Sequence, residues 1–260
     1  FRKIGATNSV LHYHRAVIGV PSNLTEVERK SVEDAVIGAG ANKAYVVEEP
    51  LAAAIGARLP IHEPTANMIV DIGGGTTEIA VISMGGIVHS KSLKLAGDRL
   101  NDDIIRFIRD EFKLAIGEPT AEELKMTIGT AMPLDEKLEM TIRGRDMATG
   151  LPKQMIVKDT HIRIALNRSI RLMIDSIREV IDATPPELVG DTLKNGIFLC
   201  GGGSLLKGFN TLLSKELMVP VNIIDDPLTA VVRGAGIAVE QFAKYYPVVN
   251  NPLRPRDIKV

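Results

Sequence analysis

The hydrophobic and polar positions near the start of the chain alternate between short apolar runs and longer mixed segments. The apolar runs predict strands and the mixed segments predict helices: strands at 16–21 and 43–47, helices at 25–39 and 51–57. Thr25 and Glu28 have the spacing of a capping box at the first helix, and Pro50 suits the first turn of the second. This β-α-β-α order is typical of a mainly parallel sheet with helices packed on it.

The pattern changes in the middle of the chain, where three strands follow one another directly. Glycine turns separate these strands, which are predicted at 68–72, 76–83 and 87–95. Periodicity further along predicts helices at 100–113, 120–128, 161–181, 205–216 and 229–243, a hairpin of 138–142 with 155–157, and strands at 197–200 and 221–224. Thr120 and Glu123 have the spacing of a second capping box. Residues from Tyr246 onward carry prolines and charges and predict an extended tail. The fold class is therefore α/β.

Composition narrows the class of protein. Hydrophobic residues make up 45% of the 260 residues and charged residues 24%, as in soluble globular proteins. The formal net charge of -1 gives no support to a nucleic-acid-binding surface, so we expect no nucleic-acid partner. Cys200 is the one cysteine, which excludes an intrachain disulfide framework and favours a reducing compartment.

A carboxylate followed by three glycines is the most informative feature of the chain. Asp71 stands near the end of an apolar run, and Gly73, Gly74 and Gly75 come directly after that run. Consecutive glycines permit positive φ and leave no Cβ in the way, so backbone N–H groups can surround an anion. A carboxylate beside such a loop would repel phosphate unless a cation lay between them. The pattern indicates a Mg-nucleotide site, although an ordinary hairpin with a strand-end Asp explains this motif alone about equally well.

A second triple glycine strengthens the nucleotide interpretation. Gly201, Gly202 and Gly203 follow the apolar strand 197–200 and precede a predicted helix. Ligands of open α/β sheets bind beyond the carboxyl ends of the strands, where both loops would lie. The N–H groups of the second loop and of the helix start could face a ribose or phosphate. The two loops together favour a nucleotide site.

Six segments carry a family resemblance: residues 18–22, 48–56, 71–78, 96–101, 121–125 and 199–204. In combination they resemble the actin and Hsp70 superfamily of ATPases, and more narrowly the MreB group of bacterial actins. The resemblance runs from about residue 4 to residue 243. It implies an actin-like ATPase fold, with RNase H-like subdomains around a nucleotide cleft. The implied division is 1–63 for the rest of the first half, 64–99 with 164–232 for the second, 100–163 for an inserted small subdomain, and 233–260 for a return to the first half and a tail.

The resemblance also implies roles for particular residues, with ATP or ADP and Mg²⁺ as ligands. Asp71 would hold Mg²⁺ through water, Glu49 would orient the attacking water, and Thr76 would couple the loop to hydrolysis. Glu122 and Lys125 lie one helical turn apart, so both can face one ligand, which the resemblance identifies as adenosine. The implied nucleotide-binding residues are Gly73, Gly74, Gly75, Thr76, Glu122, Lys125, Gly201, Gly202, Gly203, Ser204 and Leu205.

The chain departs from the family pattern at its start. Members of the superfamily carry an earlier phosphate loop of the Asp-Leu-Gly-Thr type, and the sequence that begins at Phe1 does not contain it. We expect that the N-terminal portion of a longer protein is missing. We also expect residues 1–260 by themselves to bind ATP weakly and to hydrolyse it poorly.

A loop near the start predicts contact with a membrane. Val10, Leu11 and Tyr13 stand where MreB-type proteins insert apolar side chains into the inner face of the cytoplasmic membrane. Two or three apolar side chains bind a bilayer only marginally, so this contact needs the avidity of a filament. The expected location is cytoplasmic and peripheral at that membrane.

The leading functional prediction is a bacterial actin-like cytoskeletal ATPase that polymerises with ATP. Its expected partners are copies of itself, in paired protofilaments, and membrane-bound proteins of cell shape or cell-wall elongation. The filaments would control cell shape through cell-wall synthesis or through cell helicity and motility. One alternative, an Hsp70-like chaperone, needs a peptide-binding β-domain, and a second, a small-molecule kinase, needs substrate-binding insertions. Neither feature is visible in the sequence.

Overall fold

The computed structural model describes residues 15–249. Its first part contains a parallel strand pair and two helices: β1 (Ala16–Val20), α1 (Glu26–Gly38), β2 (Ala44–Glu48) and α2 (Glu49–Gly56). Three strands follow, β3 (Asn67–Ile72), β4 (Thr77–Ser83) and β5 (Gly86–Leu93). They join two later strands, β9 (Ile197–Cys200) and β10 (Val221–Ile223), in a five-stranded sheet of order β10-β9-β3-β4-β5. The sheet is parallel between β10, β9 and β3 and antiparallel from β3 to β5.

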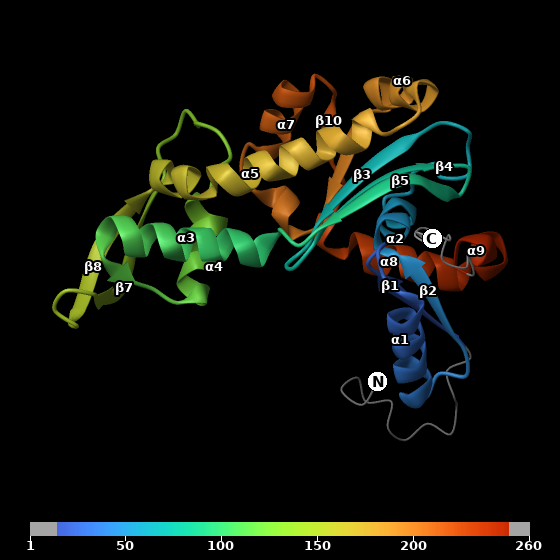
Figure 1. Ribbon diagram of the computed structural model, residues 1–260, viewed down its shortest axis with the longest axis horizontal. Coiled ribbons are helices and arrows are strands. Elements are labelled where there is room, and N and C mark those ends of the chain that lie inside the picture. Colours follow the sequence, from blue (N-terminus) through green and yellow to red (C-terminus); the bar gives the residue numbers. More distant parts are fainter. Residues whose placement is uncertain (1–14, 250–260) are drawn as a thin grey trace, which may run out of the picture.

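Between β5 and β9 the chain forms the extended end of the molecule, then one long connecting helix, and finally a short helix that lies beside the five-stranded sheet (Figure 1). These elements are α3 (Gly97–Phe112), β6 (Leu114–Ala115), α4 (Glu118–Ile128), β7 (Glu139–Asp146), β8 (Pro152–Lys158), α5 (Asp159–Asp182) and α6 (Pro186–Asn195). The three strands make a small antiparallel sheet of order β6-β7-β8. After β9 come η3 (Gly202–Leu205), α7 (Phe209–Leu217), η4 (Pro227–Thr229), α8 (Ala230–Glu240) and α9 (Phe242–Val249).

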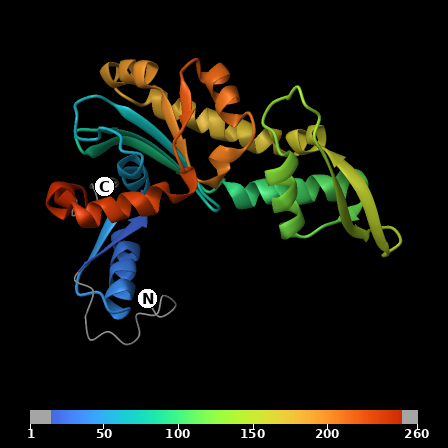
Figure 2. The same ribbon diagram turned by 180° about the vertical axis from the view of Figure 1, so that it is seen from behind.

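The five-stranded sheet separates two hydrophobic cores. Successive side chains of a strand point to opposite faces, so β3 contributes to both. Val70 and Ile72 belong to the core that contains α3 and α5, and Ile69 belongs to the core that contains α2 and α8. Figures 1 and 2 show α5 on one side of the sheet and α2 with α8 on the other. The end of β3 is therefore held from both faces.

The helices α2 and α8 cross at very short distance because glycines meet backbone at the crossing. A Cβ on Gly234 would lie 1.7 Å from the carbonyl oxygen of Ala52, and one on Gly56 would lie 2.0 Å from that of Ala230. Neither position has room for a side chain. The contact joins a helix from the start of the chain to one near its end, so it fixes the first half around Glu49, the first residue of α2.

The structure confirms most of the predicted elements and corrects three. The capping box of Thr25 and Glu28 is present, but α4 begins at Glu118, so the box predicted at Thr120 is wrong. The predicted helix 205–216 is divided into η3 and α7 by Gly208, whose φ is 73°. The tail predicted from Tyr246 starts as helix α9, because Val248 and Val249 pack into the core.

None of the helices within residues 15–249 has both the length and the apolar character that crossing a bilayer requires.

Two glycines of α8 give a matched test of the crossing. Gly234→Ala would place a methyl group against the Ala52 carbonyl, so we expect it to lower the free energy of unfolding by about 3 kcal/mol. Gly236 has open space around its Cβ position, so Gly236→Ala should stabilise the helix by about 0.5–1 kcal/mol. Urea unfolding of both variants measures the difference. Equal effects would show that the crossing does not constrain the fold.

Candidate active site

The first glycine loop joins β3 to β4 and is held in place by the start of α3. The Gly73 N–H donates to the carbonyl of Thr76 at 3.0 Å, which closes the turn. The carbonyls of Gly73 and Gly74 accept from the N–H groups of Gly97 and Asp98 at 3.1 and 2.9 Å. Within residues 15–249, no protein acceptor takes the N–H groups of Gly74, Gly75 and Thr76. Three free N–H groups in one turn can bind an anion.

The expectation that the first loop needs glycines with positive φ is wrong. A positive φ occurs in the second loop instead. The residues with positive φ do not include Gly73, Gly74 or Gly75, whereas Gly201 has a φ of 77°. A Cβ on Gly203 would lie 2.2 Å from Cγ2 of Ile72. The second loop needs glycine for its conformation and for close packing on the end of β3. In the first loop the glycines leave the backbone open toward the cavity.

Parallel pairing brings the two loops together. Val70 pairs with Leu199 and Asp71 with Cys200, so both triple glycines begin at the same edge of the sheet. The Ser204 hydroxyl is buried and donates to the carbonyl of Gly201 at 2.6 Å. Its hydroxyl is therefore used within the loop.

Helix α4 supplies a polar pair opposite the loops. The Lys125 ammonium donates to Oε2 of Glu122 at 2.7 Å and to the carbonyl of Gly97 at 3.1 Å. Asn101 donates to the same Glu122 oxygen at 2.6 Å. Burial raises the pKa of Glu122, but the hydrogen bonds from Lys125 and Asn101 outweigh it, and the pKa is lowered overall. Lys125 keeps one of its three donors for a ligand.

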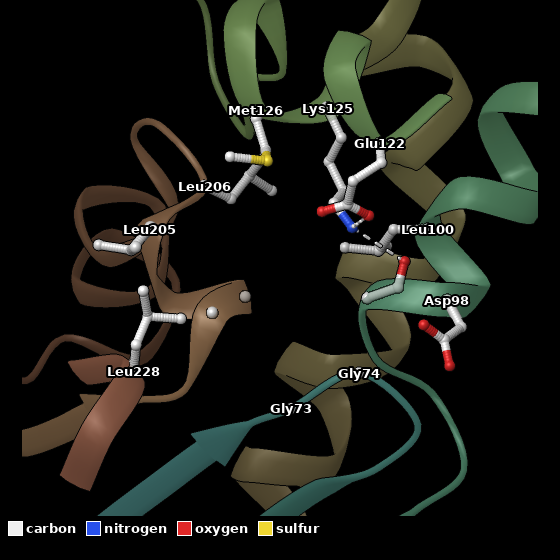
Figure 3. A pocket seen from close by; sticks show the side chains of 13 residues that line it. Gly73, Gly74, Asp98, Leu100, Glu122, Lys125, Met126, Leu205, Leu206 and Leu228 are labelled. Atoms are coloured by element: carbon white, nitrogen blue, oxygen red, sulfur yellow. Dashed lines mark hydrogen bonds and ion pairs between the residues drawn. The ribbon is translucent and has the colours of Figure 1, made fainter. Parts of the chain in front are cut away.

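These elements enclose a cavity of about 500 Å³ (Figure 3). Its lining comes from both glycine loops, the start of α3, the exposed side of α4, and η4. The lining residues are Gly73, Gly74, Gly97, Asp98, Leu100, Glu122, Lys125, Met126, Gly202, Gly203, Leu205, Leu206 and Leu228. Figure 3 shows Leu205, Leu206 and Leu228 on the side of the cavity opposite the polar pair, and Leu100 beside that pair. An apolar wall, a polar pair and open backbone N–H groups suit a ligand with a flat ring and an anionic group.

A cluster of carboxylates lies at the end of β3, on the face that packs against α2. Asp71 is 8% exposed, and a Cβ on Gly201 would lie 2.5 Å from its Oδ1. The pKa of Asp71 is raised to about 6, because burial, with a smaller contribution from the charge of Glu78, outweighs the lowering by a hydrogen bond from Cys200. Burial also raises the pKa of Glu49 to about 7, with repulsion from Asp71 and Glu78 as the next causes. Ionised, this cluster favours a cation.

The residues present fit a Mg²⁺ ion that takes most of its ligands from water and phosphate and few from the protein. Residues 15–249 contain no group of three or more His, Cys, Asp or Glu residues arranged to hold a metal ion by themselves. Mg²⁺ commonly keeps several waters and takes its other oxygens from one or two carboxylates and from phosphates. A single carboxylate, Asp71, that contacts the ion through water is consistent with this coordination.

The structure groups the site residues expected from sequence into a cavity and a carboxylate cluster. Gly73, Gly74, Glu122, Lys125, Gly202, Gly203 and Leu205 line the cavity. Glu49, Asp71, Gly75, Thr76, Gly201 and Ser204 do not line it, although Gly75 and Thr76 belong to the same turn. The residues of the expected membrane loop, Val10, Leu11 and Tyr13, lie outside the described part of the chain.

Sequence reasoning missed two features of this region. One is the start of α3, where Gly97, Asp98 and Leu100 line the cavity. The segment that contains them contributed to the family resemblance but received no role. The other is Glu78, which lies opposite Asp71 in the β3–β4 ladder. The register of a hairpin predicts such pairs, so counting across the glycine turn could have found it.

Comparison with known proteins decides the family. Residues 1–246 match the family described as MreB/Mbl protein. The chain belongs to the MreB/Mbl family. The cell shape-determining protein Mbl of Bacillus subtilis is 44% identical over 230 residues, which are 88% of this chain and 69% of Mbl. The cell shape-determining protein MreB of Escherichia coli is 43% identical over 226 residues, or 87% of this chain and 65% of MreB.

Solved structures place the fold in the same family. MreB5 of Spiroplasma citri bound to ADP matches with a TM-score of 0.90 and 35% identity, over 96% of this chain and 75% of MreB5. The same protein bound to AMPPNP matches with a TM-score of 0.89 over 94% of this chain. The expected actin-like α/β fold of the MreB/Mbl family is thus confirmed. The chain spans about two thirds of the length of the two curated relatives.

Burial of Asp71 predicts a pH-dependent stability. Its pKa is higher in the folded chain than its ordinary value of 3.8, so the folded state keeps the proton up to a higher pH than the unfolded state does. The free energy of unfolding therefore falls as pH rises from about 4 to about 6. At pH values above this range, the shift in pKa lowers the free energy of unfolding by at most about 3 kcal/mol. We expect Asp71→Asn to stabilise the chain by about 1–3 kcal/mol at pH 8 and by about half as much at pH 5.

Urea unfolding at the two pH values tests this expectation. Asp135→Asn, an exposed position outside the site, is the control and should change stability at neither pH. A variant Asp71→Asn that is less stable than the parent at pH 8 would contradict the assignment of a buried, cation-seeking carboxylate.

Proposed function

We propose that the chain is the nucleotide-binding part of a bacterial actin-like ATPase, which binds ATP and ADP and assembles with ATP into filaments. The observation that carries the proposal is the cavity between the two glycine loops, with free backbone N–H groups on one side and the Glu122–Lys125 pair on the other. The relative MreB5 of Spiroplasma citri has been solved with ADP and with AMPPNP bound. Family membership and this geometry support the same ligand class.

The proposed binding mode assigns one part of the nucleotide to each wall. The β- and γ-phosphates would lie at the N–H groups of Gly74, Gly75 and Thr76. Adenosine would lie between the Glu122–Lys125 pair and the apolar side of Leu205. Gly202 and Gly203 leave the second loop without side chains, so it can close over the ribose.

In the proposed reaction the protein positions groups more than it forms bonds. Glu49, at the first turn of α2, would orient and polarise the water that attacks the γ-phosphate, and its raised pKa suits a group that accepts a proton near neutral pH. Thr76 would connect the phosphate loop to β4 and so to closure of the two halves. Asp71 would hold Mg²⁺ through water, and that ion, when bound, supplies charge neutralisation at the phosphates.

The cellular part of the proposal rests on the family. Curated relatives carry the name cell shape-determining protein. We propose paired protofilaments, peripheral at the cytoplasmic membrane, that act with membrane-bound shape or cell-wall elongation proteins. We also propose the division into 1–63, 64–99 with 164–232, 100–163 and 233–260 as the subdomains of this assembly.

A pair of adjacent glutamates tests the catalytic proposal. Glu49→Gln should slow single-turnover release of phosphate from bound ATP by about 10²-fold, because the amide accepts no proton. ATP affinity, measured by calorimetry on the full-length protein, should change less than about twofold, and ATP-dependent pelleting should persist. Glu48→Gln is the matched control and should leave turnover unchanged. A full-length protein that neither binds ATP nor pellets with it would overturn the proposal.

The membrane contact has its own test. The double variant Val10→Ser with Leu11→Ser should reduce co-sedimentation of the assembled protein with anionic liposomes about fivefold or more, since filament avidity multiplies each lost contact. Met84→Ser removes a comparable apolar side chain that is 76% exposed elsewhere, and it should leave binding unchanged. Unaltered liposome binding by the double variant would exclude the loop as the membrane contact.

A further inference from the structure

We propose that Glu78 is a third carboxylate of the nucleotide site, a positioning residue that acts through Asp71 and makes nucleotide binding depend on a divalent cation. The inference rests on the proposed nucleotide site and adds to it a residue for which the family resemblance gave no role.

Glu78 belongs to one row of side chains across three strands. Asp71 of β3 pairs with Glu78 of β4, and Glu78 pairs with Ser92 of β5. Directly paired residues of antiparallel strands point to the same face, with Cβ atoms about 4.5–5.5 Å apart. The register therefore places the Glu78 carboxylate beside that of Asp71, on the face where Glu49 begins α2.

The Glu78 side chain is buried among apolar neighbours. It is 1% exposed, and the neighbouring positions of its face include Ile69 and Ala80, which belong to a hydrophobic core. The Ser92 hydroxyl donates to Oε1 at 2.5 Å. Oε2 is buried, and within the described residues Ser22 and Thr76 lie near the carboxylate without reaching hydrogen-bonding geometry to this oxygen. Burial therefore raises the pKa of Glu78, and the polar groups around it, with Ser92 first, only partly oppose this effect.

In the described part of the chain, this carboxylate cluster has no basic partner within ion-pair distance. Within residues 15–249, none of the ion pairs joins a Lys or Arg to Glu49, Asp71 or Glu78. Three carboxylates without a basic partner repel one another, and this repulsion is strong because the surroundings are apolar. A divalent cation near Asp71 would relieve the repulsion for all three at once. An anionic triphosphate that arrived alone would increase it. Glu78 therefore strengthens cation binding and weakens cation-free nucleotide binding, without touching either ligand.

The experiment measures the ATP affinity of the full-length protein with Mg²⁺ and with EDTA, by calorimetry or fluorescence. The ratio of the two dissociation constants measures the dependence on the cation. Glu78→Gln keeps the size of the side chain and an acceptor for Ser92, so it isolates the charge. We expect it to weaken binding with Mg²⁺, to tighten binding with EDTA, and to reduce the ratio about three- to tenfold.

Three further variants separate charge from packing. Ser92→Ala removes the hydrogen bond and keeps the charge, so the ratio should stay within about twofold. Glu78→Asp keeps the charge and should retain most of the ratio. Glu187→Gln, an exposed change of equal charge in α6, should have no effect. If Glu78→Gln does not fold, Glu78→Met removes the charge without adding a buried amide and carries the same expectation.

The outcomes distinguish this inference from the proposed function. A parent chain that binds ATP with Mg²⁺ dependence, together with a Glu78→Gln variant of unchanged ratio, would overturn the inference and leave the nucleotide site standing. A parent chain that binds no ATP in either condition would overturn both. A reduced ratio in Ser92→Ala equal to that in Glu78→Gln would show that packing of β5 is responsible, which also contradicts the inference.

Discussion

One strand, β3, sustains both hydrophobic cores and delivers the carboxylate of the site. Its side chains alternate between the two faces, so Val70 and Ile72 pack toward α5, while Ile69 and Asp71 point toward α2. The strand is buried along its whole length. Asp71 is therefore an ionisable residue in a buried strand where packing favours apolar side chains. Its pKa is raised because burial disfavours the charged carboxylate. Because the two hydrophobic cores hold β3 in place, they also fix the position of the candidate site at its end.

Close backbone approach makes the site possible. Gly201 and Gly203 lie against the end of β3 at distances that exclude a Cβ, and Gly234 does the same where α8 crosses α2. These contacts bring segments that are more than one hundred residues apart to one edge of the sheet. The carboxylates at this edge lower the stability of the fold when no cation is bound. Such a loss of stability is common at functional sites.

The sequence predicted the local elements better than their ends. The periodicity of β3, β4 and α3 and the capping box at Thr25 depend on neighbours in the chain, and they were confirmed. The box at Thr120 was wrong because Pro119 already occupies the first turn of a helix that starts earlier. The tail at Tyr246 was wrong because burial of Val248 and Val249 outweighs the proline inside α9.

The sequence by itself determined the α/β class, the two glycine loops and the family, since all three depend on residue types at fixed spacing. It did not reveal which loop needs positive φ, that α3 lines the cavity, or that Glu78 stands beside Asp71. Only the tertiary structure decided these points, because they depend on register, burial and contacts between distant segments. Such contacts form through packing, which leaves little trace in the local pattern of residues.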